Sequence, residues 1–265
     1  MNGIAITLFD SHTHLDDAAF DADRDAVLRR AAEAGVTEAL VAAVTAGRWP
    51  TLQAVCARPG NAIRLHPAYG LHPMFMDAHD DADLDALENW LRDRGDDAVA
   101  VGECGLDFQV GIEHERQRRF FRHQIGLARE LDRPLILHAR KAVEEVILTL
   151  RHEGPVRGVV HSYGGSVEQA RQLWDLGIHI GLGGPVTHER AHKLHRLAAS
   201  IPLEQLLLET DAPDQPGAAH RHERNEPAYL TEVLDVVARL RDTARATIAA
   251  ATHTNARRLF GLPRT

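Results

Sequence analysis

The chain has 265 residues, of which 44% are apolar and 26% are charged, so it has enough apolar material for the core of an ordinary soluble protein. Its formal net charge of −8 excludes a protein that coats nucleic acid through a broad basic surface. We expect neither an export signal nor a membrane span, because no window approaches about 18 uninterrupted apolar residues. With only 2 cysteines we expect no disulfide framework, and a reducing cytoplasm is the expected location.

Short aliphatic or β-branched runs alternate with amphipathic stretches along the chain, which predicts strands that alternate with helices. The predicted strands are residues 4–10, 38–44, 63–71, 98–104, 134–138, 156–161, 178–182 and 206–210. The predicted helices are residues 21–34, 83–94, 113–131, 142–152, 167–176, 188–199, 227–240 and 244–259. The spacing of roughly 25–35 residues per strand and helix fits repeated right-handed βαβ crossovers.

The eight predicted strands favour an α/β fold with a single (β/α)8 TIM-type barrel. A doubly wound open sheet could use the same elements. The number of strands, and the polar residues at so many strand ends, favour the barrel. We expect residues 1–265 to form one domain, since such barrels typically take about 250 residues. Ser166 as an N-cap, with Gly35 and Gly177 as left-handed C-caps, supports the predicted helix boundaries.

Residues of metal-ligating type stand at or just past the ends of five predicted strands. They are His12, His14, Glu103, His138, His161 and Asp211. Because the carboxyl ends of barrel strands converge on one face, side chains that are far apart in sequence can meet there. Four imidazoles and two carboxylates that converge in this way predict a dinuclear metal site at the C-terminal ends of the strands.

Each of these signals is weak when taken alone. His12 and His14 point the same way on an extended segment, but a chain with 17 histidines contains such pairs by chance. A second copy of the pair, His220 and His222, falls in a predicted loop, where we expect a surface position. Glycines near Glu103 leave room for close approach to an ion, and one carboxylate can bridge two metals.

The last predicted strand carries two acidic residues on one side. Asp211 can serve as a metal ligand and accept a proton from the attacking water. Glu209 points to the same side of the barrel, one layer deeper, where we expect it to support the ligands. A carboxylate inside a barrel is costly unless it meets an ion or a hydrogen bond.

Seven motifs occur in order along the chain: FDSHTHLDD, GLHP, VGECGLDF, ILHAR, VVHSYGGS, LLLETDAP and RNEP. From about residue 9 to the end, the chain thereby resembles the TatD family of metal-dependent deoxyribonucleases, within the amidohydrolase-type barrels. The resemblance implies that six residues hold two divalent ions. It assigns the first ion to His12, His14 and Asp211, the second to His138 and His161, and both to a bridging Glu103.

Two further residues fall where this family contacts the substrate phosphate, namely His72 of GLHP and Arg140 of HAR. The chain also departs from the family pattern. Met74 follows GLHP where many members carry another histidine, HSYGG replaces the commoner HxFSG, and residues 215–222 differ from the usual loop after TDAP. These changes are expected at the entrance for the substrate. We therefore expect them to affect which substrate is preferred more than how the bond is hydrolysed.

The resulting hypothesis is a hydrolase that cleaves phosphodiester bonds in DNA, from an end, by water activated between two metals, with Glu103 and Asp211 as catalytic residues. Mg²⁺ or Mn²⁺ suits this chemistry, and four imidazoles would also bind Zn²⁺ in purified protein. An aromatic content of 5% argues against a long stacking platform, so short ends or oligonucleotides are the expected substrates. We expect a monomer that needs no protein partner and no membrane.

Two alternatives remain open on the sequence. The same site could hydrolyse a small-molecule ester, lactone or amide, although related barrels often place a carboxylated lysine where this chain has Glu103. A metal-stabilised scaffold or binding protein is the other alternative. Structural metal sites usually have closed shells and favour cysteine, which this ligand set lacks.

Overall fold

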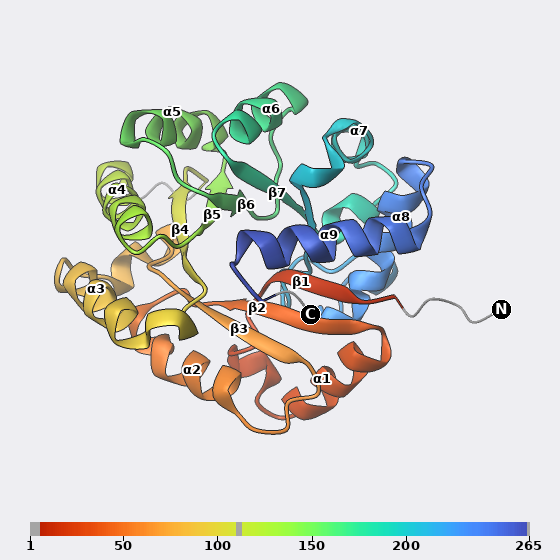
Figure 1. The fold of residues 1–265 in the computed structure, drawn as a ribbon, viewed down its shortest axis with the longest axis horizontal. Coiled ribbons are helices and arrows are strands. Elements are labelled where there is room, and N and C mark those ends of the chain that lie inside the picture. The colour runs from red at the N-terminus through yellow and green to blue at the C-terminus, as the bar shows by residue number, and fades with distance from the viewer. Residues whose placement is uncertain (1–5, 110–112, 264–265) are drawn as a thin grey trace.

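A computed structural model describes residues 6–109 and 113–263 of the chain. Eight parallel strands form one sheet in which each strand pairs with its neighbours in sequence, and helices surround the ring of strands (Figure 1). The strands are β1 (Leu8–Thr13), β2 (Val36–Ala42), β3 (Arg64–Tyr69), β4 (Ala100–Asp107), β5 (Leu135–Arg140), β6 (Gly158–Val160), β7 (Ile178–Leu182) and β8 (Leu206–Leu208). The predicted (β/α)8 barrel is confirmed.

The helices alternate with the strands, apart from two that follow β8. They are α1 (Arg24–Glu33), α2 (Trp49–Ala57), α3 (Ala82–Arg94), α4 (His114–Glu130), α5 (Val143–Glu153), α6 (Val167–Asp175), α7 (His192–Ser200), α8 (Leu230–Leu240) and α9 (Arg245–Leu259). Over the described residues, no helix has the length and apolar character needed to cross a bilayer. Cys56 and Cys104 are both free thiols.

The sequence analysis does not predict α2, and it places the first strand too early. Pro50 looks like a helix breaker, but it lies in the first turn of α2, where its missing N–H has no hydrogen-bond partner to lose. The strand predicted over 4–10, whose first two residues lie outside the described range, runs instead over Leu8–Thr13. It continues through polar residues because they are hydrogen-bonded where β1 meets β8.

The contact between β1 and β8 is built from buried polar groups. Thr210 donates to Asp10 twice, from its hydroxyl at 2.6 Å and from its backbone N–H at 2.9 Å. The hydroxyl of Ser11 donates to the carbonyl of Leu208 at 3.0 Å. The backbone N–H of Asp211 donates to the carbonyl of His12 at 2.9 Å, so the two ends of the barrel sequence meet at the predicted site.

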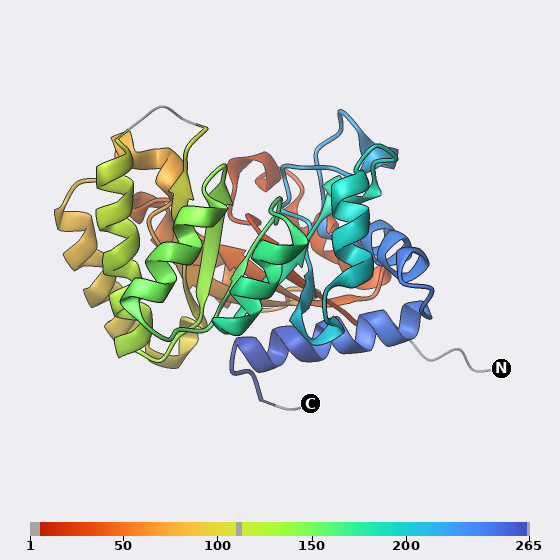
Figure 2. The same ribbon diagram turned by 90° about the horizontal axis from the view of Figure 1, so that it is seen from above.

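Apolar side chains inside the barrel form a core separate from the one between strands and helices. The inner cluster consists of Phe9, Leu40, Ala42, Ala68, Val99, Ala100, Ile136, Val159, Leu207, Ala256, Leu259 and Phe260. The last three come from the end of α9 and the residue after it, and Figure 2 shows α9 lying across one end of the barrel. This end of the barrel is closed by α9. The opposite end, at the carboxyl ends of the strands, is left open to ligands.

A buried ion network joins α9 to the closed end of the barrel. Glu38 of β2 accepts a hydrogen bond from Arg257, and its other oxygen lies 2.7 Å from Nε2 of His66. Nε2 of His253 lies 3.4 Å from Glu38 Oε1. Glu38 is 5% exposed and Arg257 is 7% exposed, so both charges have been removed from water. Their mutual attraction offsets part of the free energy that this removal costs.

We therefore expect Glu38→Gln to lower the free energy of unfolding by about 3 kcal/mol or more, because Arg257 is left buried without a counter-charge. Urea denaturation measures this change. Glu33→Gln removes an exposed charge from α1 and serves as the matched control, with an expected change below about 0.5 kcal/mol. Equal stabilities of the two variants would contradict the assigned role of the network.

The same network predicts a pH dependence of stability. Burial acts to raise the pKa of Glu38, but hydrogen bonds from His253, His66 and Arg257 outweigh it and hold the pKa below the ordinary value of 4.5. A carboxyl whose pKa is lower in the folded state stabilises that state above its unfolded pKa, and the stabilisation is lost as the pH falls through the folded pKa. The stability gap between the wild type and Glu38→Gln is therefore expected to shrink below pH 4.5. A gap as large there as at neutral pH would contradict this.

Candidate metal centre

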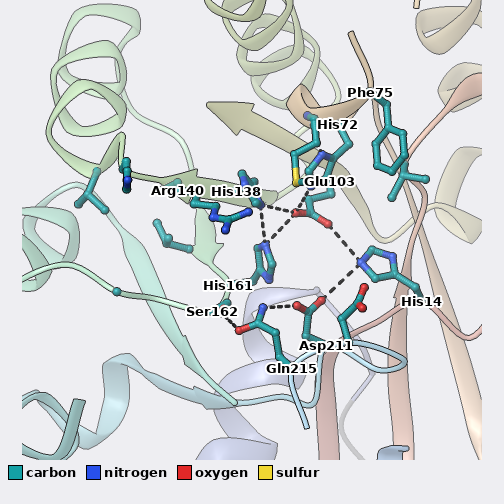
Figure 3. A pocket seen from close by; sticks show the side chains of 18 of the residues that line it. His14, His72, Phe75, Glu103, His138, Arg140, His161, Ser162, Asp211 and Gln215 are labelled. Atoms are coloured by element: carbon teal, nitrogen blue, oxygen red, sulfur yellow. Dashed lines mark hydrogen bonds and ion pairs between the residues drawn. The ribbon is translucent and has the colours of Figure 1, made fainter. Parts of the chain in front are cut away.

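All six residues predicted as metal ligands lie close together at the open end of the barrel, and Figure 3 shows the five that line the cavity. They are His12 in β1, His14 directly after it, Glu103 in β4, His138 in β5, His161 directly after β6, and Asp211 shortly after β8. All of them except the fully buried His12 line a cavity of about 960 Å³.

Strand alternation accounts for most of this convergence. Ile136, Val159 and Leu207 fill the inner core, and His138, His161 and Glu209 each lie two residues further along the same inner face. Strict alternation would turn Glu103 outward, because Ala100 faces the inner core. An irregular register in β4 between Val101 and Cys104 corrects the alternation and brings Glu103 to the inner face.

The two oxygens of Glu103 face two different pairs of histidines. Oε2 lies 3.2 Å from Nε2 of His12 and 3.5 Å from Nε2 of His14. Oε1 lies 3.0 Å from Nδ1 of His138 and 2.8 Å from Nε2 of His161. The carboxylate therefore stands between two donor sets that share it.

Asp211 completes the first donor set. Its Oδ1 lies 3.4 Å from Nε2 of His12 and 3.5 Å from Nε2 of His14, and these two nitrogens are 3.2 Å apart. Ligand bonds of about 2.0–2.2 Å place neighbouring ligand atoms about 3.0–3.6 Å apart around one ion. Each of these nitrogen–oxygen distances, and the distance between the two nitrogens, thus fits neighbouring ligands of one cation.

Hydrogen bonds on the far side of two rings fix which nitrogen faces the cavity. Nδ1 of His14 lies 2.8 Å from the carbonyl of Ala42, which can only accept, so this nitrogen carries the proton. Nε2 of His138 lies 2.7 Å from Oδ2 of Asp107 and donates to it. His14 Nε2 and His138 Nδ1 therefore carry no proton, and their lone pairs point towards Glu103 and the cavity. A metal-binding ring needs such an orientation.

Glu103 is an ion in a buried site. Burial opposes its ionisation, but His161, His72 and His12 outweigh burial and hold the pKa of this carboxyl well below its usual range. Glu103 is 1% exposed, and over the described residues its Oε2 accepts no hydrogen bond. A cation beside Oε2 would satisfy this atom and the lone pair of His14 together, so the residues present fit a metal.

The two residues assigned to the substrate phosphate lie at different depths. His72 is buried, its Nδ1 accepts the backbone N–H of Met74 at 3.0 Å, and its Nε2 lies 2.7 Å from Oε1 of Glu103. Burial lowers the pKa of His72 to about 4, so the ring is neutral and donates to Glu103 from Nε2. Arg140 is exposed at the rim, and its guanidinium has no hydrogen-bond or ion-pair partner among the described residues. A phosphate contact by either residue stays a prediction.

Sequence reasoning missed Asp107 and Gln215. Asp107 follows Glu103 by four residues on the same inner face of β4, so the period of two could have found it. Gln215 donates to Oδ2 of Asp211 and accepts from the hydroxyl of Ser162 at 2.7 Å. It lies in the loop after β8, where no periodicity marks a single glutamine.

Glu209 lies inside the barrel, and the pair His220 and His222 lies away from the predicted ligands, as the sequence analysis expects. Glu209 is buried, and its Oε1 accepts the backbone N–H of Ser162. His220 stacks on Tyr229 with ring centroids 3.5 Å apart, and His222 is exposed. Neither histidine belongs to a group of potential metal ligands in the described part of the chain.

Comparison with known proteins agrees with this geometry. Residues 9–261 match the family described as TatD related DNase. The chain is 39% identical over 256 residues to an uncharacterised metal-dependent hydrolase, YjjV of Escherichia coli K12, covering 96% of this chain and 98% of that protein. The crystal structure of YjjV superposes with a TM-score of 0.91 at 36% identity, covering 98% of this chain and all (100%) of that one.

A second relative carries a named activity. The 3′-5′ ssDNA/RNA exonuclease TatD of Pantoea ananatis is 35% identical over 268 residues, covering 96% of this chain and 100% of that protein. The resemblance found in the sequence is therefore confirmed, and the chain belongs to the TatD family of metal-dependent hydrolases.

Proposed function

We propose that this protein is a deoxyribonuclease that hydrolyses phosphodiester bonds near an end of DNA, with two divalent metal ions. The observation that carries the proposal is the position of Glu103, whose two oxygens face two separate pairs of histidines. A bridging carboxylate of this kind is what a two-metal centre needs. The named activity of the Pantoea ananatis relative adds support for a nucleic-acid substrate.

The chain would divide its donors between two ions. His12, His14 and Asp211 would hold the first, His138 and His161 the second, and Glu103 both. When bound, such ions act as Lewis acids, lower the pKa of water and stabilise charge on the attacking and leaving oxygens. Mg²⁺ or Mn²⁺ suits this reaction, and an imidazole-rich site would also retain Zn²⁺ during purification.

Side chains of the protein would position the reactants and move the proton. In the hydrolysis the water oxygen bonds to phosphorus, the bond from phosphorus to the leaving sugar oxygen breaks, and Asp211 takes a proton from the water. The leaving oxygen takes its proton from solvent. Gln215 holds Oδ2 of Asp211, so that Oδ1 faces the centre. His72 orients Glu103, and the unpaired guanidinium of Arg140 would meet the phosphate.

Metal stoichiometry tests the two donor sets. We expect the wild type to bind two equivalents, the double variant His12→Ala/His14→Ala to bind about one, and hydrolysis by that variant to fall at least about a hundredfold. Elemental analysis after equilibrium dialysis measures the metal, and circular dichroism verifies the fold.

The chain supplies a matched control for this experiment. His220→Ala/His222→Ala removes the other His-x-His pair, which lies away from the centre, and should leave both stoichiometry and activity unchanged. Equal metal loss in both double variants, or one equivalent in the wild type, would refute the two-metal site.

The substrate is tested with oligonucleotides labelled at the 3′ or the 5′ end, alongside a panel of carboxylic esters and lactones, with each metal in turn. We expect stepwise shortening of the oligonucleotide, loss of activity on chelation and recovery when Mg²⁺ or Mn²⁺ is added back. Glu103→Gln should lower the rate by about a thousandfold, since a neutral amide cannot bridge two cations in the same way. Hydrolysis of the panel alone would replace the nuclease by a small-molecule hydrolase.

A further inference from the structure

Two consecutive apolar side chains are exposed at the rim of the metal cavity. Met74 and Phe75 are each 41% exposed, and both line the cavity. In the described part of the chain, only one other large apolar side chain, Leu148 on α5, is exposed to a comparable degree. Exposed apolar area is unfavourable in water, so its concentration beside a catalytic cavity indicates contact with a ligand.

The segment that carries this pair is held firmly. It is η3 (Pro73–Ala78), two 3₁₀ turns that meet at a kink at Phe75, and its Met76 is buried. Arg116 of α4 donates to the backbone carbonyls of Met76, at 3.2 Å, and of His79. The exposure of Phe75 is thus a property of a fixed surface, and binding against it costs little ordering of the backbone.

The pair lies close to the reacting centre. The ring of Phe75 meets the ring of His72 edge-on, with centroids 5.5 Å apart at 76°, and His72 in turn contacts Glu103 at 2.7 Å. One imidazole ring therefore separates the apolar surface from the bridging carboxylate. A group bound on Phe75 would belong to the same nucleotide as the phosphate at the centre, or to the next one.

The other side of the cavity is cationic. Arg140 is the last residue of β5, and Lys141 follows it. Lys193 of α7 donates to the carbonyl of Gly164 at 2.6 Å, and all three cations line the cavity. Figure 3 shows Phe75 and Arg140 on opposite sides of Glu103. Cations suit the phosphates of a strand, whereas the apolar side suits the faces of its bases.

We propose that Met74 and Phe75 form a stacking surface for one nucleobase beside the bond that is cleaved, and so determine specificity. The inference rests on the proposed nuclease function and adds to it the residues that contact the nucleobase. One aromatic ring can hold one base, and a base that is already paired and stacked in a duplex is not available to it. Preference for an unpaired terminal nucleotide follows.

Binding is tested without turnover, in metal-free protein with a chelator present. The probes are single-stranded oligonucleotides with 2-aminopurine at the 3′ end in one and at the 5′ end in the other, because its fluorescence falls when it stacks. We expect the wild type and Phe75→Trp to quench one of the two probes, and Phe75→Ala to bind it roughly tenfold more weakly with no quenching. Leu148→Ala removes a similarly exposed side chain elsewhere and should behave as the wild type.

Cleavage supplies a second, independent readout. Oligonucleotides that end in a normal nucleotide are compared with otherwise identical ones that end in an abasic residue. We expect the wild type to prefer the normal end by about tenfold in kcat/KM, and Phe75→Ala to cleave both ends at the wild-type rate for the abasic end. Equal wild-type rates on the two ends, together with cleavage of both, would overturn the stacking surface and leave the nuclease standing.

Failure of the proposed function has a different signature. If no oligonucleotide is cleaved with any metal, the nuclease proposal fails, and the fluorescence titration alone decides the inference. Quenching that depends on Phe75 then supports a nucleobase-binding surface. Absence of quenching with both probes, or quenching that persists in Phe75→Ala, overturns it.

Discussion

The site depends on one buried charge, the carboxylate of Glu103. Taking a carboxylate out of water costs several kcal/mol, which only close and well-directed partners can offset. Here five imidazoles surround it, four of them in the two donor sets and the fifth, from His72, holding Oε1 by a hydrogen bond. Because its two oxygens face different sets, the same carboxylate fixes where two cations would lie relative to each other.

Two irregular strands allow the barrel to present these groups without losing its core. In β4 the register shifts between Val101 and Cys104, and in β1 it shifts between Asp10 and Thr13. Each shifted stretch follows a residue that fills the inner core, Ala100 or Phe9, and contains a site residue that must also face inward, Glu103 or His12. With strict alternation, either the core residue or the site residue of these strands would face inward, but not both. The shift in register lets both face inward.

The sequence predicts what strand alternation controls and misses what depends on contacts between distant segments. His138, His161 and Asp211 follow apolar core positions by even spacings, so their convergence could be expected from a barrel. The inward turn of Glu103 depends on a register shift that no local pattern marks. Gln215 acts through the loop after β8, by contacts with Ser162 and Asp211, and α2 is absent from the predicted helices although its proline stands in the first turn.

The predicted ligands and the rim of the cavity are carried by different parts of the fold. The predicted ligands lie in β1, β4 and β5 or just after β1, β6 and β8, and most of them are buried, so substitution there would disturb the packed interior. Met74 and Gln215, which the sequence analysis expects to depart from the family pattern, lie in the segments after β3 and β8 that line the cavity. Such segments can change without altering the core, so differences in substrate among relatives should arise there while the centre is retained.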